Sequence, residues 1–344
     1  MILRLLLTLP VCLTLATAAG AADVCAPKIL RPLAGDTESQ ARAVNAAGQA
    51  VGWSKGPRGV RAVFWDAAGR PHVLSPLPGD TIARAYGLNS DGVVVGDSEG
   101  ATFNAVVWRL DRKPRRLAFP SGHEQGHARS INDKGLIAGW SLDRTDGKGP
   151  AGGQALHGVV WRGASVLRDL APLAGDLETL ALDINAKGET VGVSYGRDGR
   201  ETAVLWSSDG TPTALPQLAK RNTGVAFAIN AGGEAAGVSG RPAWAIPTAW
   251  TPAAEALPEP TGVTRSLGLD NDGAGEAAGY GQGTGGSHVA LFWDRDGRVH
   301  VLPPLAGDVD TEAFGIAAGP LVAGHSLGAR GVKGVLWRVA ASCR

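Results

Sequence analysis

Three side chains able to do acid–base or metal chemistry lie within five residues of one another, at His123, Glu124 and His127. An imidazole can move a proton near neutral pH or bind a metal ion. The two histidines are four residues apart, but the surrounding pattern is a loop leading into a strand, so helical zinc-ligand geometry does not apply. We interpret them as solvated loop histidines, with a metal site as the alternative.

A second group of polar side chains occupies equivalent places in a repeated strand. Arg42, Tyr86 and Arg129 each stand three residues before a recurrent Asn, and a buried guanidinium needs a partner because an unpaired one is costly. The possible partners are Asp36, Glu38, Asp80, Asp176 and Glu178. Structural ion pairs are the first interpretation, and a polar pocket for an anionic or hydroxyl-rich ligand is the alternative. Later repeats carry apolar residues there, expected in the core between blades: Leu182, Phe227, Leu267 and Phe314.

A Gly-x-Ser-x-Gly sequence at residues 324–328 matches the nucleophile elbow of esterases. That chemistry requires an acid and a histidine later in the chain, and neither follows Ser326. The same register gives Gly-Trp-Ser at 52–54 and Gly-Val-Ser at 192–194. We therefore interpret the motif as part of a repeat.

That repeat, of about 44 residues, runs through almost the whole chain. Its Asn position is expected at Asn45, Asn89, Asn132, Asn185, Asn230, Asp270 and Ala317, where the last two depart from the pattern. Its Trp position is held by Trp65, Trp108, Trp161, Trp206, Trp250, Trp293 and Trp337. The asparagines are predicted to close turns and the tryptophans to form core.

Each repeat contains four short strand signals separated by Gly-containing turns, for example at 41–44, 50–54, 61–65 and 72–74. Such a unit cannot bury its apolar face alone, so neighbouring units must pack together. The sequence predicts an all-β fold, a seven-bladed β-propeller of four-stranded antiparallel blades. The seventh repeat lacks its last strand, and residues 28–36 match 72–80, so the N-terminal strand is expected to complete the last blade.

The ends of the chain predict export. One basic residue, an apolar stretch and a run of small residues make residues 1–22 a signal peptide, leaving 23–344 as a single propeller domain. Cys25 and Cys343 are then the two remaining cysteines, predicted to form a disulfide in an oxidising compartment. The formal net charge of +1 gives no indication of nucleic-acid binding, and no later segment is expected to span a membrane.

The repeats also resemble a known family. The segments 128–141 with 157–161, and 181–194 with 203–206, resemble the extracellular HAF-repeat family of bacterial exported proteins. The histidine of the His-Ala-Phe pattern is kept only at His157. The resemblance implies a periplasmic or secreted repeat protein and leaves its biochemical activity undefined.

These features favour a non-catalytic binding or interaction scaffold acting through one loop-rich face of the propeller, with an unknown protein or glycan ligand. The alternative is a glycan-active hydrolase or lyase using carboxylates and His on the same face. No cofactor, metal or catalytic residue is assigned, and a monomer is expected. The candidate ligand face comprises Arg42, Tyr86, His123, Glu124, His127, Arg129, Asp36, Asp80 and Asp176.

Overall fold

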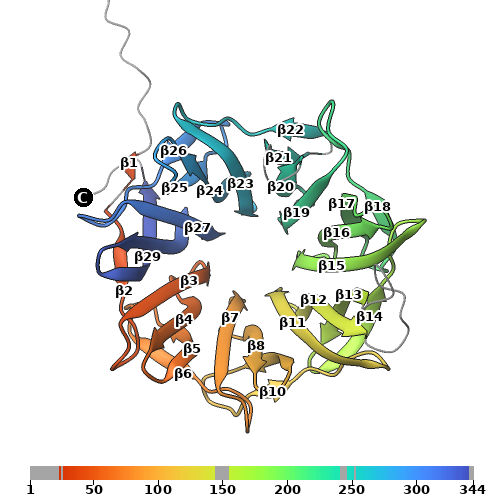
Figure 1. Ribbon diagram of the computed structural model, residues 1–344, viewed down its shortest axis with the longest axis horizontal. Coiled ribbons are helices and arrows are strands. Elements are labelled where there is room, and N and C mark those ends of the chain that lie inside the picture. The colour runs from red at the N-terminus through yellow and green to blue at the C-terminus, as the bar shows by residue number, and fades with distance from the viewer. Residues whose placement is uncertain (1–22, 25, 144–154, 241–245, 252, 341–344) are drawn as a thin grey trace, which may run out of the picture.

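The computed structural model describes residues 23–24, 26–143, 155–240, 246–251 and 253–340. Within these ranges the chain forms seven antiparallel sheets around a central axis, the seventh with one additional short strand (Figure 1). The predicted seven-bladed β-propeller is confirmed. No helix in the described part of the chain is long and apolar enough to cross a membrane.

The strands follow one order in every blade, with the first strand innermost (Figure 1). Blades one and two contain β3 (Glu38–Val44), β4 (Ala50–Gly56), β5 (Gly59–Trp65), β6 (Pro71–Leu74), β7 (Ile82–Leu88), β8 (Val94–Glu99), β9 (Phe103–Trp108) and β10 (Arg115–Arg116). Blades three and four contain β11 (His123–Ile131), β12 (Leu136–Asp143), β13 (Ala155–Arg162), β14 (Ser165–Leu170), β15 (Asp176–Ile184), β16 (Thr190–Gly196), β17 (Glu201–Trp206) and β18 (Pro212–Ala214).

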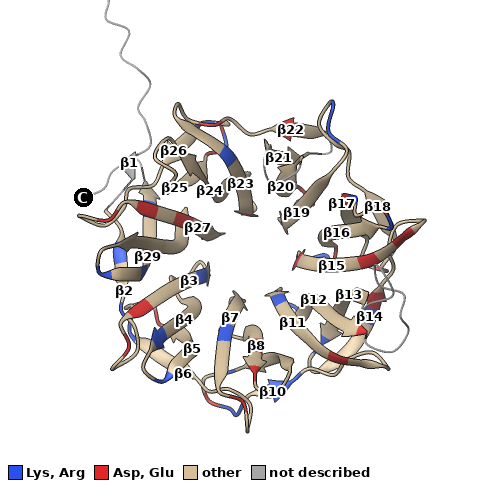
Figure 2. Ribbon diagram, viewed as in Figure 1, with Lys and Arg blue, Asp and Glu red and all other residues tan. Residues whose placement is uncertain are grey.

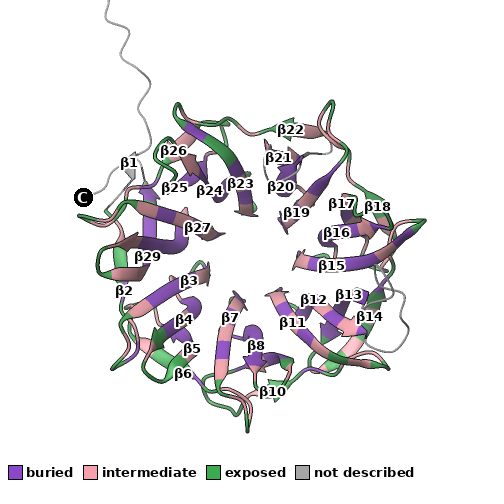
Figure 3. Cartoon of the chain, in the orientation of Figure 1, coloured by how far each residue is buried: buried purple, intermediate pink, exposed green. Residues whose placement is uncertain are grey.

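Blades five and six contain β19 (Gly224–Ile229), β20 (Ala235–Ser239), β21 (Ile246–Trp250), β22 (Ala254–Ala256), β23 (Val263–Asn271), β24 (Ala277–Gly283), β25 (His288–Trp293) and β26 (Val299–Val301). Blade seven contains β27 (Asp310–Ala317), β28 (Leu321–Gly328), β29 (Gly331–Ala340), β2 (Lys28–Leu30) and β1 (Asp23–Val24). Exposed residues follow the outer rim and its turns, whereas long buried stretches occupy the strands inside it (Figure 3).

The tryptophans near the end of each third strand join successive repeats. All seven rings are at most 2% exposed, which confirms the prediction that they are core. Each Nε1 donates a hydrogen bond of 2.5–2.8 Å to a backbone carbonyl in the linker before its own blade. The buried indole therefore keeps its one polar atom satisfied while filling the blade.

A ladder of asparagine side chains joins the inner strands near the axis. Asn132 is typical: its Oδ1 accepts from the Leu136 amide at 2.9 Å to close the turn, and its Nδ2 donates to the Asn185 carbonyl of the next blade at 2.7 Å. The bond from Nδ2 to the next blade recurs, at 2.7–3.3 Å, in Asn45, Asn89, Asn132, Asn185 and Asn230. These residues close turns as predicted, and they also fix the spacing of blades one to six.

Blade six corrects one predicted position. Asp272, and not Asp270, occupies the Asn place, because its carbonyl accepts from Asn230 and its Oδ1 accepts from the Glu276 amide. The sequence contains two overlapping candidates for this turn: Asp270 lies three residues before Gly273, and Asp272 lies three residues before Gly275. The second is used, and Gly275 adopts the positive φ that the turn needs.

The N-terminal strand completes blade seven as predicted. In β2, Lys28 lies opposite Leu336 and Leu30 opposite Gly334 of β29. Ser39 of blade one donates its hydroxyl to the Leu30 carbonyl at 2.9 Å and accepts from the Gly334 amide at 3.0 Å, so it connects the closing strand to both neighbours. The predicted signal peptide and both cysteines of the predicted disulfide, Cys25 and Cys343, lie outside the described residues.

The closure can be tested on two adjacent side chains of β2. Leu30 is fully buried in a core cluster with Trp65 and Leu336, whereas Ile29 is 47% exposed. Leu30→Ala should lower the free energy of unfolding by about 2–5 kcal/mol because it empties a packed site, and Ile29→Ala by about 0.5 kcal/mol or less. Urea unfolding of both variants checks this. Equal losses would show that β2 does not close the ring.

Candidate functional site

A central channel of about 600 Å³ runs between the inner strands. In every blade the inner strand has a β-bulge at the residue three before the Asn position, and the bulged residue lines this channel. A bulge re-aims a side chain that strict alternation would place elsewhere. The bulged residues are Arg42, Tyr86, Arg129, Leu182, Phe227, Leu269 and Phe314.

The channel position of these residues corrects the expectation that Leu182, Phe227, Leu267 and Phe314 form core between blades. All four line the channel, and in blade six the shifted register makes Leu269 the bulged residue. An unbroken alternation of faces along each strand would have placed these side chains between blades. The bulge breaks that alternation in the same place seven times.

One arc of the channel is cationic and aromatic. The guanidinium of Arg42 lies 4.1 Å from the centre of the Phe314 ring, and that of Arg129 lies 4.8 Å from the centre of the Tyr86 ring. Basic residues mark the inner ends of β3 and β11 (Figure 2). Among the described residues, Nε of Arg42 is buried without a hydrogen-bond partner. Burial lowers the pKa of Arg42, and the charge of Arg129 lowers it further.

The aspartates expected to pair with these arginines lie away from the channel. Asp36, Asp80 and Asp176 each accept a hydrogen bond of 2.6–2.7 Å from a serine hydroxyl on the second strand of their own blade. That hydroxyl in turn accepts a backbone amide of the preceding loop. These carboxylates are structural, and Asp36 is also ion-paired with Arg61 at 2.6 Å.

The same hydrogen-bond pattern explains the Gly-x-Ser-x-Gly sequence. Ser326 lies within β28, donates to Asp308 at 2.8 Å and accepts from the Leu305 amide at 3.0 Å. It stands in a strand and not on a strand-to-helix turn, so it is not placed as an esterase nucleophile.

The three residues at the start of blade three separate from the channel group as well. All three belong to β11, so the prediction that the histidines are loop residues is wrong. His127 packs between the rings of Phe103 and Trp140, and its Nδ1 lies 3.7 Å from Asp97. Glu124 is exposed. His123 contacts Ser141 and His157. Of the nine predicted residues, the structure brings together only Arg42, Tyr86 and Arg129.

Two carboxyl groups that were not predicted as site residues line the channel. Asp183 and Asp270 occupy the same place in blades four and six, directly after the bulge, where other blades have Ala, Gly or Ser. Asp183 accepts from the Ile229 amide of the next blade at 2.7 Å. Asp270 accepts from the Ile316 amide of the next blade at 2.8 Å. An acidic residue in a column of small ones was the available signal.

The pKa values of both carboxyl groups are raised. Burial raises the pKa of Asp183, and its hydrogen bonds from Ser130 and two amides oppose the rise. Burial raises the pKa of Asp270 well above its ordinary value, and the negative charge of Asp183 raises it further. The state in which both carboxyl groups are ionised is therefore disfavoured.

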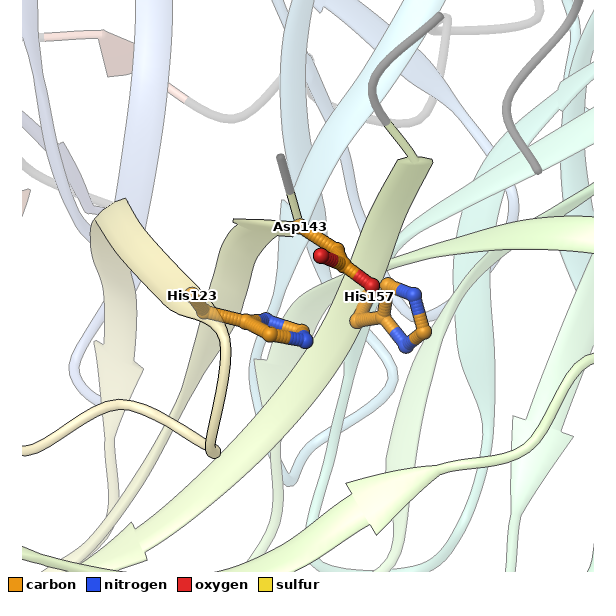
Figure 4. A group of neighbouring side chains, drawn as sticks. All are labelled: His123, Asp143 and His157. Carbon is orange, nitrogen blue, oxygen red and sulfur yellow. The ribbon is translucent and has the colours of Figure 1, made fainter. Parts of the chain in front are cut away.

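Within the described residues, two side-chain groups have the composition of metal sites. His123, Asp143 and His157 form one in blade three (Figure 4), and His288, Asp310 and Glu312 form the other between blades six and seven. In the second, Nδ1 of His288 is 2.7 Å from Glu312. Nearby, Nδ1 of His325 lies 2.9 Å from Gln40, and burial lowers the pKa of His325 to about 4.

The raised pKa of Asp270 predicts a pH dependence of stability. An unfolded Asp titrates near pH 4, so above that pH the unfolded chain releases a proton that the folded chain retains. The free energy of unfolding should therefore fall as pH rises from about 4 through the folded-state pKa. Asp270→Asn should flatten this fall, which thermal unfolding from pH 4 to 8 would measure.

The matched control is Asp209→Asn. Hydrogen bonds from Ser207 and Thr211 lower the pKa of this exposed carboxyl to about 2, so its removal cannot flatten a fall of that sign. An unchanged pH profile in Asp270→Asn would contradict the assignment.

No protein-family profile and no curated protein matches the sequence. Solved structures share the fold at low identity. A Mycobacterium tuberculosis puromycin-hydrolyzing peptidase is 19% identical with a TM-score of 0.53 and covers 84% of this chain and 49% of its own. The Pyrococcus horikoshii acylaminoacyl peptidase is 11% identical with a TM-score of 0.60 and coverages of 89% and 52%. The chain thus spans about half the length of these peptidases. Virginiamycin B lyase from Staphylococcus aureus is 12% identical, with a TM-score of 0.57 and coverages of 91% and 99%.

Proposed function

We propose that this chain is an exported, non-catalytic binding protein that takes an anionic small ligand, an acidic saccharide by preference, into its central channel. The observation that carries the proposal is the pair Arg42 and Arg129, whose guanidinium groups line the channel against aromatic rings. Export is supported by the predicted signal peptide and by the resemblance of the repeats to exported HAF-repeat proteins.

The two arginines suit an anion because both positive charges line the same channel. Arg42 and Arg129 carry like charges, and the charge of Arg129 lowers the pKa of Arg42. A carboxylate between them would compensate both charges through charge-assisted hydrogen bonds, which guanidinium groups make in bidentate geometry. The partner-free Nε of Arg42 offers one of the donors.

The rest of the channel lining suits a ligand whose anionic group is attached to a compact ring. The rings of Tyr86, Tyr280 and Phe314 lie on the cationic side. The opposite side presents the apolar side chains of Leu182, Phe227 and Leu269, together with the amide-bonded carboxyl groups of Asp183 and Asp270. A volume of about 600 Å³ is within the range of about 300–1,000 Å³ typical of small-molecule sites. Sugar rings present apolar faces that stack on aromatic side chains, so a uronic-acid saccharide suits both sides of the channel.

The alternative is a glycan-active hydrolase or lyase in the same channel. Asp183 and Asp270 favour it in one respect, because a raised carboxyl pKa is the property of a general acid. Against it, both oxygens of each carboxyl accept backbone amides or a hydroxyl. This arrangement supports a role in holding the blades. Recovery of the bound saccharide unchanged after prolonged incubation would distinguish binding from turnover.

The test uses Arg42→Leu and Arg129→Leu, singly and together. Melting temperatures with uronic-acid oligosaccharides and with their neutral counterparts should show stabilisation of the wild type by the acidic ligands alone, because a ligand that binds the folded state stabilises it. Each substitution should weaken binding about 10- to 100-fold, the value of one charge-assisted hydrogen bond. Calorimetric titration measures the affinities.

Arg70→Leu is the control. It removes the same charge from the same blade as Arg42, at a side chain that is 79% exposed and outside the channel. It should leave the affinity unchanged. If the double variant unfolds at a much lower temperature while retaining its affinity, the arginines are structural and the proposed binding site is wrong.

A further inference from the structure

Blade three departs from a pattern shared by four other blades at two positions that face each other across adjacent strands. Where blade three has His123, four other blades have an aspartate: Asp36, Asp80, Asp176 and Asp308. At the facing position, blade three has Asp143 and the same four blades have glycine: Gly56, Gly100, Gly196 and Gly328. The register of strand pairing shows that these positions are equivalent, because His123 pairs with Asp143 as Asp176 pairs with Gly196.

The glycines have a steric reason. A Cβ at Gly56, Gly100 or Gly328 would collide with the carboxylate of the facing aspartate. Blade three has changed both members of the pair, because a histidine replaces the aspartate and an aspartate replaces the glycine. The result moves the carboxylate from the first strand to the second and places an imidazole opposite it.

A third departure lies beside the first two. On β13, His157 pairs with Ser141, and the equivalent position is Arg61, Asn104, Thr202 or Lys333 in other blades. Ser141 and Asp143 are alternate residues of β12, so their side chains share one face of the sheet. His123 and His157, their cross-strand partners, share that face too. Figure 4 shows the three side chains converging from neighbouring strands.

The geometry is that of a metal site. One ligand atom from each of His123, Asp143 and His157 lies within 4.8 Å of the others, and the two imidazole rings meet edge to face with centres 4.7 Å apart. Ligand atoms around a tetrahedral zinc ion are about 3.3 Å apart, given bonds of about 2.0–2.1 Å. Metal binding therefore requires side-chain rotations that bring the three ligand atoms closer together.

Neighbouring groups orient both rings. Nδ1 of His123 lies 2.7 Å from the Ser141 hydroxyl, and Nδ1 of His157 lies 3.5 Å from Asp169 on β14. Metal-binding histidines usually direct their second nitrogen to a carboxylate or another polar group in this way, which fixes the ring and its tautomer. Nε2 is then the ligand atom of each ring.

We propose that His123, Asp143 and His157 bind one divalent transition-metal ion, with Zn²⁺ the best match to two imidazoles and one carboxylate. Three protein ligands leave a coordination position for water or for an oxygen of a bound ligand. Mg²⁺ is disfavoured because it prefers an all-oxygen, octahedral set. This site lies outside the channel lining and does not depend on the proposed anion binding.

The decisive variant restores the common repeat in blade three. His123→Asp combined with Asp143→Gly recreates the Asp–Gly pair that four other blades fold with, so the metal-free melting temperature should be retained. Calorimetric titration of metal-stripped wild-type protein with Zn²⁺ should give one site and a rise in melting temperature. The double variant should lose affinity about 100-fold or more, and Mg²⁺ should give no heat with either protein.

His288→Ala is the control, because His288 belongs to the second group of potential ligands. It should leave Zn²⁺ affinity and the stoichiometry of one unchanged. Absence of Zn²⁺ binding by the wild type, or unaltered binding by the double variant, would overturn the proposal. Loss of binding in His288→Ala alone would move the metal to the other group and equally overturn it.

Discussion

The structure depends on one side-chain amide in each of blades one to five. Each asparagine closes the turn after its inner strand through Oδ1 and bonds the next blade through Nδ2, so turn geometry and blade spacing are set together. Neither Asp272 nor Ala317 can donate such a bond. Between blades six and seven, Asp270 accepts the Ile316 amide, so this buried acid joins the blades where the ladder ends.

The sequence was sufficient for the architecture because repeat length, strand count and the displaced last strand are all local patterns. It was insufficient for the channel, because a bulge in each inner strand turns Arg42 and its equivalents toward the axis. Simple alternation cannot reveal an inserted residue. The turn predicted for blade six was wrong for a different reason. Two overlapping turn signals fit the repeat pattern there, and only packing selects the one at Asp272.

The repeats also provide an internal reference for function. Positions that agree among several blades, such as the Ser–Asp pairs of blades one, two, four and seven, are explained by hydrogen bonds that those blades share. Positions at which one blade differs in several contacting residues are not explained that way. His123, Asp143 and His157 are of this kind, and the signal was present in the sequence. Asp143 stands where blades one, two, four and seven have glycine, and its facing residue His123 stands where the same four blades have aspartate.

The central claim, that side-chain amides hold adjacent blades at the spacing of the channel, is tested most directly at Asn132. Asn132→Asp keeps the oxygen that closes the turn, as Asp272 does in blade six, and removes only the donor to the Asn185 carbonyl. Urea unfolding should show a loss of about 1–3 kcal/mol, because that buried carbonyl loses its donor and faces a carboxylate. Stability equal to the wild type, with a loss only in Asn132→Ala, would contradict the account.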